Sequence, residues 1–481
     1  MKNSLKARSL AVVIAAALVL AGCVTPQSEE PRGTPIDGTA MGLAGTSIAP
    51  LAEDWWKAFN DPQLDTLIDA SLQNSPSLAQ AMARVRAAEA HDLQVGGGNK
   101  PQTAIDAEEI WQRFSANYYI PPPFGGRKFW VGQVEGNLNW NLDFWGRQSE
   151  LIHQARSQKA ATELDAASAR LALGGAIAQA YVELYRSWEM IDIATRLQEQ
   201  REQLLKLTQR RVSAGLDTQV EVKIAEAALP QARAARMQAE SARDLAVHRL
   251  AELAGYGADR YEQIGRPRLM LDAALPLPDK LPIDLLGRRP DVLAARVRVD
   301  AATAGREAAH AAFYPDISLT AFAGMQAIGI DNLTDGGSLV YGIGPRLHLP
   351  IFQSQRLRSG YTNATAELDE SVASYNSVVL SAVRETADQL SLGDSLNRQI
   401  VEVRQTLGAA TIAYDLAQRR YGAGLTTQLV VLRAESQVLD ARRDLVNARA
   451  GLVGSRVALL LMLGGSFDPA TPAATSGSGA T

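Results

Sequence analysis

The chain has 481 residues, of which 46% are hydrophobic and 21% charged, a composition that excludes a disordered polymer. Its formal net charge is −4, with Lys and Arg spread along the chain, which argues against a nucleic-acid binder with a basic patch. The single cysteine, Cys23, excludes a disulfide framework and a cysteine-based zinc site. The five histidines include no pair at helical ligand spacing, which argues against a metalloenzyme. The absence of 18 uninterrupted apolar residues argues against a transmembrane helix.

Residues 1–22 are predicted to be a secretory signal peptide, because a positively charged start precedes a short apolar core. The segment ends in Leu20-Ala21-Gly22-Cys23, which resembles the bacterial lipobox. We therefore expect Cys23 to carry a diacylglycerol thioether and an N-acyl chain, since several acyl chains anchor a protein stably. The alternative is an ordinary cleavage site with a chance cysteine beside it. Because position 24 is Val and not the Asp that commonly retains lipoproteins at the inner membrane, the outer membrane is the expected location.

The two ends of the mature chain are expected to lack regular structure. Residues 23–52 are rich in Pro, Gly and Thr and are predicted to be a lipid-anchored flexible tether. Residues 466–481 are of low complexity and are predicted to be a disordered tail.

The body of the chain indicates a tandem duplication. Residues 208–226 and 417–435 match at eleven of nineteen positions, where about one match is expected by chance. We therefore divide the body into repeat 1 (53–256), a Pro-rich linker (257–283) and repeat 2 (284–465). The period is too long for a solenoid, so each repeat is a whole structural unit.

Both repeats are predicted to contain the same elements in the same order: a medium helix, two strands, a very long helix, a Gly turn and a last helix. The fold class is therefore mixed and mostly α. The expected ranges are 62–95 and 284–312 for the medium helices, about 102–145 and 315–352 for the strands, about 148–212 and 355–421 for the long helices, and 217–254 and 426–463 for the last helices.

The strands show period-2 alternation, most clearly from Phe129 to Phe144, where apolar residues alternate with Asn, Gln, Glu and Asp. A water-exposed sandwich would give one polar face, but aromatic residues near the strand ends favour a membrane barrel with a polar lumen. Four strands cannot close such a barrel, and open edges in a bilayer would leave backbone groups unpaired. Several chains must then share one barrel.

The helices are unusually long, since residues 148–211 would reach about 96 Å. An apolar stripe at spacings of three and four, running from Leu173 to Ile191, is typical of coiled-coil-like packing.

Several motifs mark the element boundaries: Asp54-Trp55-Trp56 near the start, Trp140-Asn141-Leu142-Asp143-Phe144-Trp145-Gly146-Arg147 at a strand-to-helix junction, Arg288-Arg289-Pro290-Asp291, Phe313-Tyr314-Pro315 and Arg420-Tyr421-Gly422-Ala423-Gly424. In this order, with the duplication and the lipobox, they resemble the TolC-like outer membrane factor family, the NodT-type lipoproteins of RND efflux systems. The resemblance covers about residues 53–465.

The resemblance implies a homotrimer with a 12-stranded transmembrane β-barrel and an α-barrel tunnel that reaches about 100 Å into the periplasm. The linker 257–283 would lie in the equatorial region. The expected partners are a periplasmic adaptor, an inner-membrane RND pump and outer-membrane lipid of a Gram-negative bacterium, without a cofactor. The implied function is a passive conduit for small molecules. The alternatives are the conduit of a type I protein-secretion system and a lipid-anchored coiled-coil scaffold without a pore; the polar-faced strands argue against the scaffold.

The resemblance also implies that the two helical turns form a periplasmic aperture. The family often places acidic residues about one turn beyond, but here the matching positions hold Val430 and Arg433, which puts cation selectivity in doubt. Arg433 would favour anions if it faces the lumen, or it points outward and pairs with a neighbouring helix. Leu429 would form a constriction or pack within the coiled coil. The aperture candidates are Arg420, Tyr421, Leu429 and Arg433 on the second turn, and Arg210, Arg211 and Asp217 on the first.

Overall fold

The computed structural model describes residues 29–36, 41, 54–117, 120–269, 285–350, 352–465 and 467. Cys23, the expected signal peptide and the expected C-terminal tail from residue 468 onward lie outside the described residues. The chain divides into two compact units, and four helices run through both of them. Unit 1 combines residues up to 35 with 85–162 and 295–375, and unit 2 combines 36–84, 163–294 and 376 onward.

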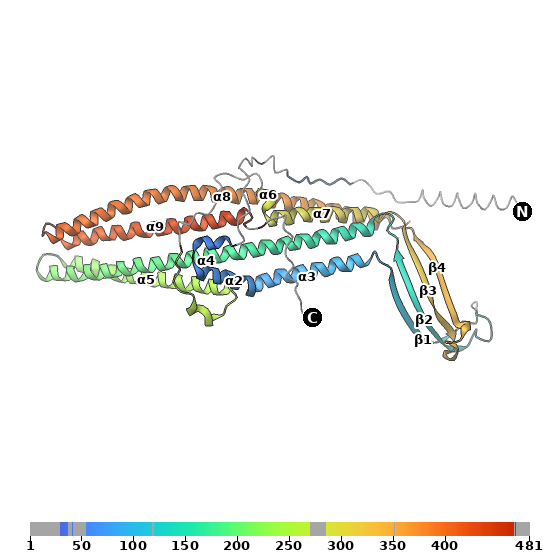
Figure 1. Cartoon of the computed structure of the whole chain (residues 1–481). Coiled ribbons are helices and arrows are strands. Elements are labelled where there is room, and N and C mark those ends of the chain that lie inside the picture. The colour runs from blue at the N-terminus through green and yellow to red at the C-terminus, as the bar shows by residue number, and fades with distance from the viewer. Residues whose placement is uncertain are drawn as a thin grey trace. The chain divides into compact units, whose positions relative to one another are not determined.

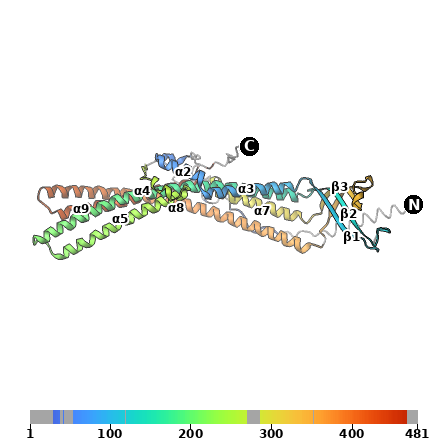
Figure 2. The same ribbon diagram turned by 90° about the horizontal axis from the view of Figure 1, so that it is seen from below.

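Unit 1 contains a four-stranded antiparallel sheet in the order β1-β2-β3-β4, drawn as one curved layer in Figures 1 and 2. The strands are β1 (Gln102–Arg113), β2 (Lys128–Asn141), β3 (Asp316–Ile328) and β4 (Leu339–His348). The register pairs Glu108 with Gln133, and Val134 with Met325. Because β1 and β4 each pair with one strand, both edges of the sheet are open among the described residues.

The predicted alternation divides this sheet into two faces. One face is polar and is built around Asp106, Glu108 and Glu135. The opposite face is apolar and is largely uncovered by the described chain, since Ile105 is 81% exposed and Ile343 is 77% exposed. A continuous apolar face that the chain itself leaves exposed indicates contact with another protein surface or with lipid.

The turn from β2 into α4 (Arg147–Ser213) depends on Asp143. Its carboxylate accepts hydrogen bonds from the backbone N–H of Gln148 (2.9 Å) and Ser149 (2.7 Å) and from the Ser149 hydroxyl (2.7 Å). Partial burial raises the pKa of Asp143, but these hydrogen bonds outweigh it and lower the pKa overall. The capping explains why β2 ends at Asn141 and not near residue 145, as alternation had suggested.

Residues 29–36 contact the helices of the chain, although the sequence had predicted a flexible tether over 23–52. The N–H groups of Arg32 and Gly33 donate to the Asp369 carboxylate (2.8 and 2.9 Å), and the N–H of Ile36 donates to the Asn376 side chain (2.8 Å). The Glu29 carboxylate accepts from the Thr362 hydroxyl at 2.7 Å. We call residues 29–36 the N-terminal strap. Its three anchor positions on α8 (Ser354–Gly422) recur every seven residues, which places them on one helix face.

Unit 2 is helical. It contains the 3₁₀ turn η2 (Trp55–Phe59), α2 (Pro62–Asn74), the start of α3 (Pro76–Gly97), α5 (Gln219–Leu253), η3 (Ala258–Gln263), α6 (Leu285–Arg288), the start of α7 (Pro290–Ala311), α9 (Gln428–Met462) and the later parts of α4 and α8. The long helices α4 and α8 confirm the predicted ranges to within one residue at each end.

Both medium helices were wrongly predicted as continuous. The first breaks at Ser75, before Pro76, and the second breaks at Arg289, before Pro290. Proline lacks an N–H and disfavours a helical residue before it, so it opens the following helix instead of continuing the preceding one. At the second break, buried Arg289 pairs with Asp291 (2.7 Å) and Glu385 (3.4 Å), which gives the Arg-Arg-Pro-Asp motif its structural role.

The core of unit 2 confirms the predicted stripe on α4. Leu173, Ile177, Tyr181 and Leu184 are buried together with Trp55, and the partly buried Trp56 packs against this cluster. The Tyr181 hydroxyl donates to Asp61 (2.8 Å). Burial and this neighbouring carboxylate raise the pKa of Tyr181 far above its usual 10.0.

Helix α9 is long and apolar enough, by length and composition alone, to cross a membrane. Half of that apolar window is buried inside the structure, where Leu452 packs with Ile400 of α8 and Val457 lies in the core with α4. Its apolar character therefore serves packing within unit 2.

Candidate functional site at the helical turns

The turns that join α4 to α5 and α8 to α9 have the same backbone geometry. Gly215 and Gly424 both adopt φ +72°, the left-handed conformation that glycine tolerates best. The N–H that follows each glycine donates to a helix carbonyl at 2.8 Å, that of Arg211 in the first turn and that of Arg420 in the second. The matching sequences around the two glycines thus produce matching helix ends.

The two turns differ in charge. In the first, Arg211 donates to the Asp217 carboxylate at 2.6 Å, and this hydrogen bond lowers the pKa of Asp217. In the second, the residues that correspond to this pair are Arg420 and Thr426. Within the part of the chain that the structure describes, Arg420 has no ion pair. The positive charge of Arg211 is therefore neutralised by Asp217 in the first turn, whereas that of Arg420 has no such partner among the described residues around the second.

Two other predicted aperture residues, Arg210 and Arg433, add to the positive charge of Arg420. Arg210, Arg420 and Arg433 are all exposed, and none has a carboxylate partner among the described residues. Tyr421 is also exposed, at 46%, whereas Leu429 is half-buried. The structure thus places all seven candidates at or beside the two turns of unit 2. It leaves the roles of Arg433 and Leu429 as predictions.

The carboxylate nearest the second turn on α9 is directed away from solvent. Glu435 is buried, with 7% of its surface exposed. Its carboxylate accepts a hydrogen bond from Nε of Arg196 on α4 at 2.8 Å and forms an ion pair with the same guanidinium at 2.6 Å. Sequence reasoning missed this pair. The available signal was a lone glutamate on the apolar face of α9, close to the turn.

Glu435 belongs to a row of contacts between α4 and α9. The Gln200 amide donates to the backbone carbonyl of Leu432, and Arg201 reaches the Ser436 hydroxyl at 3.4 Å. We call these contacts, with Arg196–Glu435, the α4–α9 ties. They join the helix pair α4/α5 to the helix pair α8/α9 close to the turns, so they resist separation of the two pairs.

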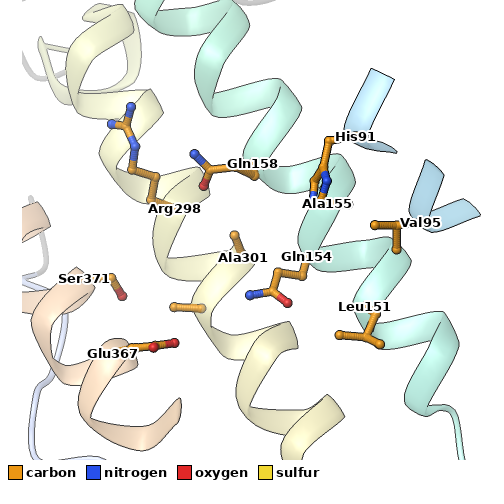
Figure 3. Close-up of a pocket in the computed structure, with 11 residues that line it drawn as sticks. His91, Val95, Leu151, Gln154, Ala155, Gln158, Arg298, Ala301, Glu367 and Ser371 are labelled. Atoms are coloured by element: carbon orange, nitrogen blue, oxygen red, sulfur yellow. The ribbon is translucent and has the colours of Figure 1, made fainter. Parts of the chain in front are cut away.

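Unit 1 contains a cavity of about 490 Å³ among α3, α4, α7 and α8, shown in Figure 3. Gln154 and Gln158 of α4 face Glu367 and Ser371 of α8 across it, with Arg298 of α7 beside them. The residues that line it include no nucleophile hydrogen-bonded to a base. This arrangement lacks the constellation that nucleophilic catalysis requires.

The fold has close counterparts among known proteins. The outer membrane protein VceC from Vibrio cholerae has a TM-score of 0.80 at 34% identity, covering 87% of this chain and 100% of that chain. The Campylobacter jejuni channel CmeC has a TM-score of 0.81 at 20% identity, which shows the shared fold, over 94% of this chain and 96% of that one. Long helices joined to a small antiparallel sheet thus define a TolC-like outer-membrane channel.

The sequence comparisons agree. The model of the family "Outer membrane efflux protein" matches residues 67–256 and 281–465. The fusaric acid resistance protein FusA of Burkholderia cepacia is 37% identical over 74% of this chain and 68% of its own length. The outer membrane protein OprJ of Pseudomonas aeruginosa is 31% identical over 94% of this chain and 95% of its own. The chain therefore belongs to the outer membrane efflux protein family, and its relatives are channel and transport proteins.

This family membership confirms the resemblance drawn from the motifs. It also confirms the predicted location, the outer membrane of a Gram-negative bacterium with the helical part in the periplasm.

Proposed function

We propose that the protein is the outer-membrane conduit of a tripartite RND-type efflux system, a passive homotrimeric channel that carries small molecules from the periplasm to the exterior. The observation that carries the proposal is the open, two-faced sheet in a chain of the efflux family. An adaptor in the periplasm and an RND pump in the inner membrane would supply substrate and energy.

The sheet supports the trimer. Both β1 and β4 have open edges, and a bilayer offers no water to satisfy their backbone groups. Three copies joined edge to edge give the predicted 12-stranded barrel, within the range of known membrane barrels. The polar face, with Glu108 and Glu135, would then line a water-filled lumen.

The apolar face matches the thickness of a membrane. Trp130 lies beside Trp111 near the outer strand ends, with ring centroids 5.4 Å apart, and Trp140 lies near the other end of β2. Ten residues separate Trp130 from Trp140, which is about 34 Å along the strand. A strand tilt of about 40° reduces this to about 26 Å, close to the 25 Å band of such barrels.

The helices of unit 2 also have unpartnered flanks. Contacts within the chain give the order α5-α4-α9-α8, visible in Figure 1, with α5 and α8 at the two sides. Val220 and Ile224 of α5 are about 60% exposed, and so is Ile412 of α8. In a trimer, α5 of one copy would pack on α8 of the next and close a 12-helix tunnel, the form expected of a tandem duplication that supplies two similar helix pairs per chain.

Cys23 is proposed as the lipid attachment site. Six residues separate it from Glu29 at the start of the N-terminal strap, so the acyl chains would lie within about 20 Å of that contact. The strap would thus determine where along unit 1 the anchor enters the membrane. The covalent lipid would be the diacylglycerol thioether with an added N-acyl chain.

The names of the relatives indicate the class of cargo. FusA is named for resistance to fusaric acid, and OpmQ of Pseudomonas putida, at 28% identity, is named for pyoverdine export. Both are small molecules, which favours efflux over the alternative of protein secretion by a type I system.

The first test is accumulation of a fluorescent efflux dye in cells that lack the protein and in restored cells. We expect higher accumulation that restoration reverses. A matched pair of variants sharpens the test. A Cβ at Gly324 would lie 2.1 Å from the carbonyl oxygen of Val134, whereas one at Gly336 meets nothing within 4 Å. Gly324→Ala should fail to restore efflux, and Gly336→Ala should restore it. Unchanged accumulation without the protein would refute small-molecule efflux.

The aperture is tested separately. We propose that Arg433 faces the lumen and gives the channel an anion preference, and that Leu429 narrows it. Reversal potentials across a salt gradient should move toward cation selectivity in Arg433→Ala, and conductance should rise in Leu429→Ala. Identical reversal potentials, or unchanged conductance, would remove the respective role.

A further inference from the structure

The apolar face of β1 holds one carboxylate. Alternation places Ile105, Glu109 and Trp111 on the same face of the strand, the face that carries the Trp111–Trp130 pair. Glu109 lies two residues inside Trp111, about 7 Å along the strand toward the apolar band. Its neighbours on this face of the sheet are apolar, and Gly132 is directly opposite it on β2. Among the described residues, the Glu109 side chain has no hydrogen-bond or ion-pair partner.

The open edge of β4 presents a matching feature. The register places Leu339, Tyr341, Ile343, Pro345 and Leu347 on the apolar face. Tyr341 is the one polar side chain in this row of β4, it is 76% exposed, and its hydroxyl has no partner in the described part of the chain. On the face that would meet lipid, Glu109 is therefore the one carboxylate of β1, and Tyr341 is the one polar side chain of β4.

In the proposed barrel, β4 of one copy pairs with β1 of the next, and we call this junction a seam. The backbone N–H and C=O groups of Glu109 and Tyr341 both point toward the seam. The N–H of Phe114 donates to the carbonyl of Arg127 at 3.0 Å, so even-numbered residues of β1 face β2 and odd-numbered ones face the open edge. The same alternation, followed through the 2.9 Å bond from Leu142 to the Ile317 carbonyl, directs odd-numbered residues of β4 to the other open edge. Glu109 and Tyr341 both belong to these sets.

The lengths of the strands limit the registers that a seam can adopt. β4 has 10 residues and β1 has 12. Two registers pair every residue of β4 with a residue of β1 in a neighbouring copy while keeping the apolar faces together. In one, Tyr341 lies opposite Glu109; in the other, Ile343 lies opposite Glu109 and Tyr341 is its diagonal neighbour.

The strand tilt agrees with this pair of registers. Within one copy, Ile105, Gly136, Ala323 and Tyr341 form a row across the sheet. Across the seam, Tyr341 at the end of this row lies opposite residue 109 or residue 111 of the next copy, which is four or six residues beyond Ile105, where the row began. This displacement per copy corresponds to a strand tilt of about 35° or about 46° for the closed barrel. Membrane barrels have tilts of about 35–45°.

We propose that the hydroxyl of Tyr341 donates a hydrogen bond to the carboxylate of Glu109 in the neighbouring copy, and that this contact selects the register of all three seams. A carboxylate that faces lipid is costly unless it has a partner, and Tyr341 is the polar partner that the neighbouring strand offers on that face. The inference rests on the proposed trimeric barrel.

The test is a disulfide cross-link in the full chain, purified in detergent. Directly opposite residues in a hydrogen-bonded pair have Cα atoms about 5.5 Å apart, within disulfide range, whereas diagonal neighbours at about 7–8 Å are outside it. After mild oxidation, Glu109→Cys/Tyr341→Cys should give a covalent trimer on denaturing gels without reductant. The matched control, Glu109→Cys/Ile343→Cys, should give at least five-fold less, and the unchanged chain should give none.

The possible outcomes separate the contact from the trimer itself. A trimer that persists without denaturation but links through the control pair would overturn the register. Absence of any trimer would instead refute the proposed function.

A second measurement tests the hydrogen bond. The dissociation temperature of the trimer should fall in Tyr341→Phe and recover in Glu109→Leu/Tyr341→Phe. It should stay near that of the unchanged chain in Glu109→Gln, because removing a charge that faces lipid offsets the weaker, neutral hydrogen bond. Strictly additive losses in Glu109→Leu, Tyr341→Phe and the double variant would show that the two side chains do not interact.

Discussion

Replacing Glu435 by glutamine is expected to lower the thermal unfolding midpoint of the purified protein by about 2 °C. The carboxylate of Glu435 is buried, its Oε1 accepts a hydrogen bond from Nε of Arg196 at 2.8 Å, and Nη2 of the same guanidinium lies 2.6 Å from that oxygen as an ion pair. The amide keeps the shape and one acceptor but removes the charge, and charge-assisted hydrogen bonds are roughly twice as strong as neutral ones. We expect a loss of about 1.5 kcal/mol per chain.

The shift in midpoint follows from the size of the chain. The entropy of unfolding of roughly 400 ordered residues is about 0.8 kcal/mol per kelvin, so a loss of about 1.5 kcal/mol in stability lowers the midpoint by about 2 °C. Arg196 supplies its own control, because it also reaches Glu199 at 3.1 Å, where both side chains are about half exposed. Such a pair contributes about 0.5 kcal/mol or less, so Glu199→Gln should move the midpoint by about 0.5 °C.

The assay is intrinsic-fluorescence thermal unfolding, followed by single-channel conductance of the same samples. Because the Arg196–Glu435 pair joins the two helix pairs near the turns, Glu435→Gln should also increase the time spent in high-conductance states. Equal midpoint shifts for Glu435→Gln and Glu199→Gln would refute the reasoning that burial of the carboxylate makes this tie strong.

Three further outcomes are expected. Asp369→Ala removes the acceptor for two N–H groups of the N-terminal strap, so trypsin should cleave after Arg32 at least several-fold faster, as followed by mass spectrometry, whereas Glu370→Ala should not change the rate. Tyr181→Phe should lower stability by about 1–3 kcal/mol, because it removes the buried hydroxyl that donates to Asp61 and leaves that carboxylate only the backbone N–H donors of Gln63 and Arg268. Since the folded pKa of Tyr181 is raised above 10.0, this difference in stability from the unchanged chain should be constant below pH 10 and shrink as pH rises further, and a difference independent of alkaline pH would contradict the assignment. Gly424→Ala should lower stability by about 1 kcal/mol in chemical unfolding, because its φ is +72° although a Cβ would meet nothing within 4 Å; Gly422→Ala, without the positive φ, should be neutral or slightly stabilising, and equal effects would argue against backbone strain at the turn.

Much of the fold could be predicted because apolar residues recur at helical or strand spacing over long segments of the sequence. The stripe from Leu173 to Leu184 predicted the buried face of α4, and alternation predicted β2 except for its last residues. The errors were local. A helix ends before each of Pro76 and Pro290, and a new helix begins at the proline. Asp143 ends a strand because its carboxylate caps the next helix. In both cases backbone hydrogen bonding overrides the apolar pattern.

The candidate site was harder to predict than the fold. The turns followed from two glycines in matching sequences, and the structure places the predicted arginines around them. The Arg196–Glu435 pair was missed because its members are far apart in sequence: the position of Glu435 on the apolar face of α9 marks one member, but no local pattern identifies Arg196 as its partner. The N-terminal strap was missed for a similar reason, since composition predicts a flexible segment and Asp369, its main acceptor, lies on a helix more than 300 residues away.

The sequence by itself determined the class of element at nearly every position and the order of the elements, because hydrophobic periods of 2 and 3.6 depend only on local geometry. The tertiary structure decided which charges are neutralised, which edges stay open and which polar groups on the apolar face lack partners. These properties depend on distances between residues far apart in the chain, such as Arg196 and Glu435, and on the register that places Glu109 and Tyr341 on the same face of the sheet.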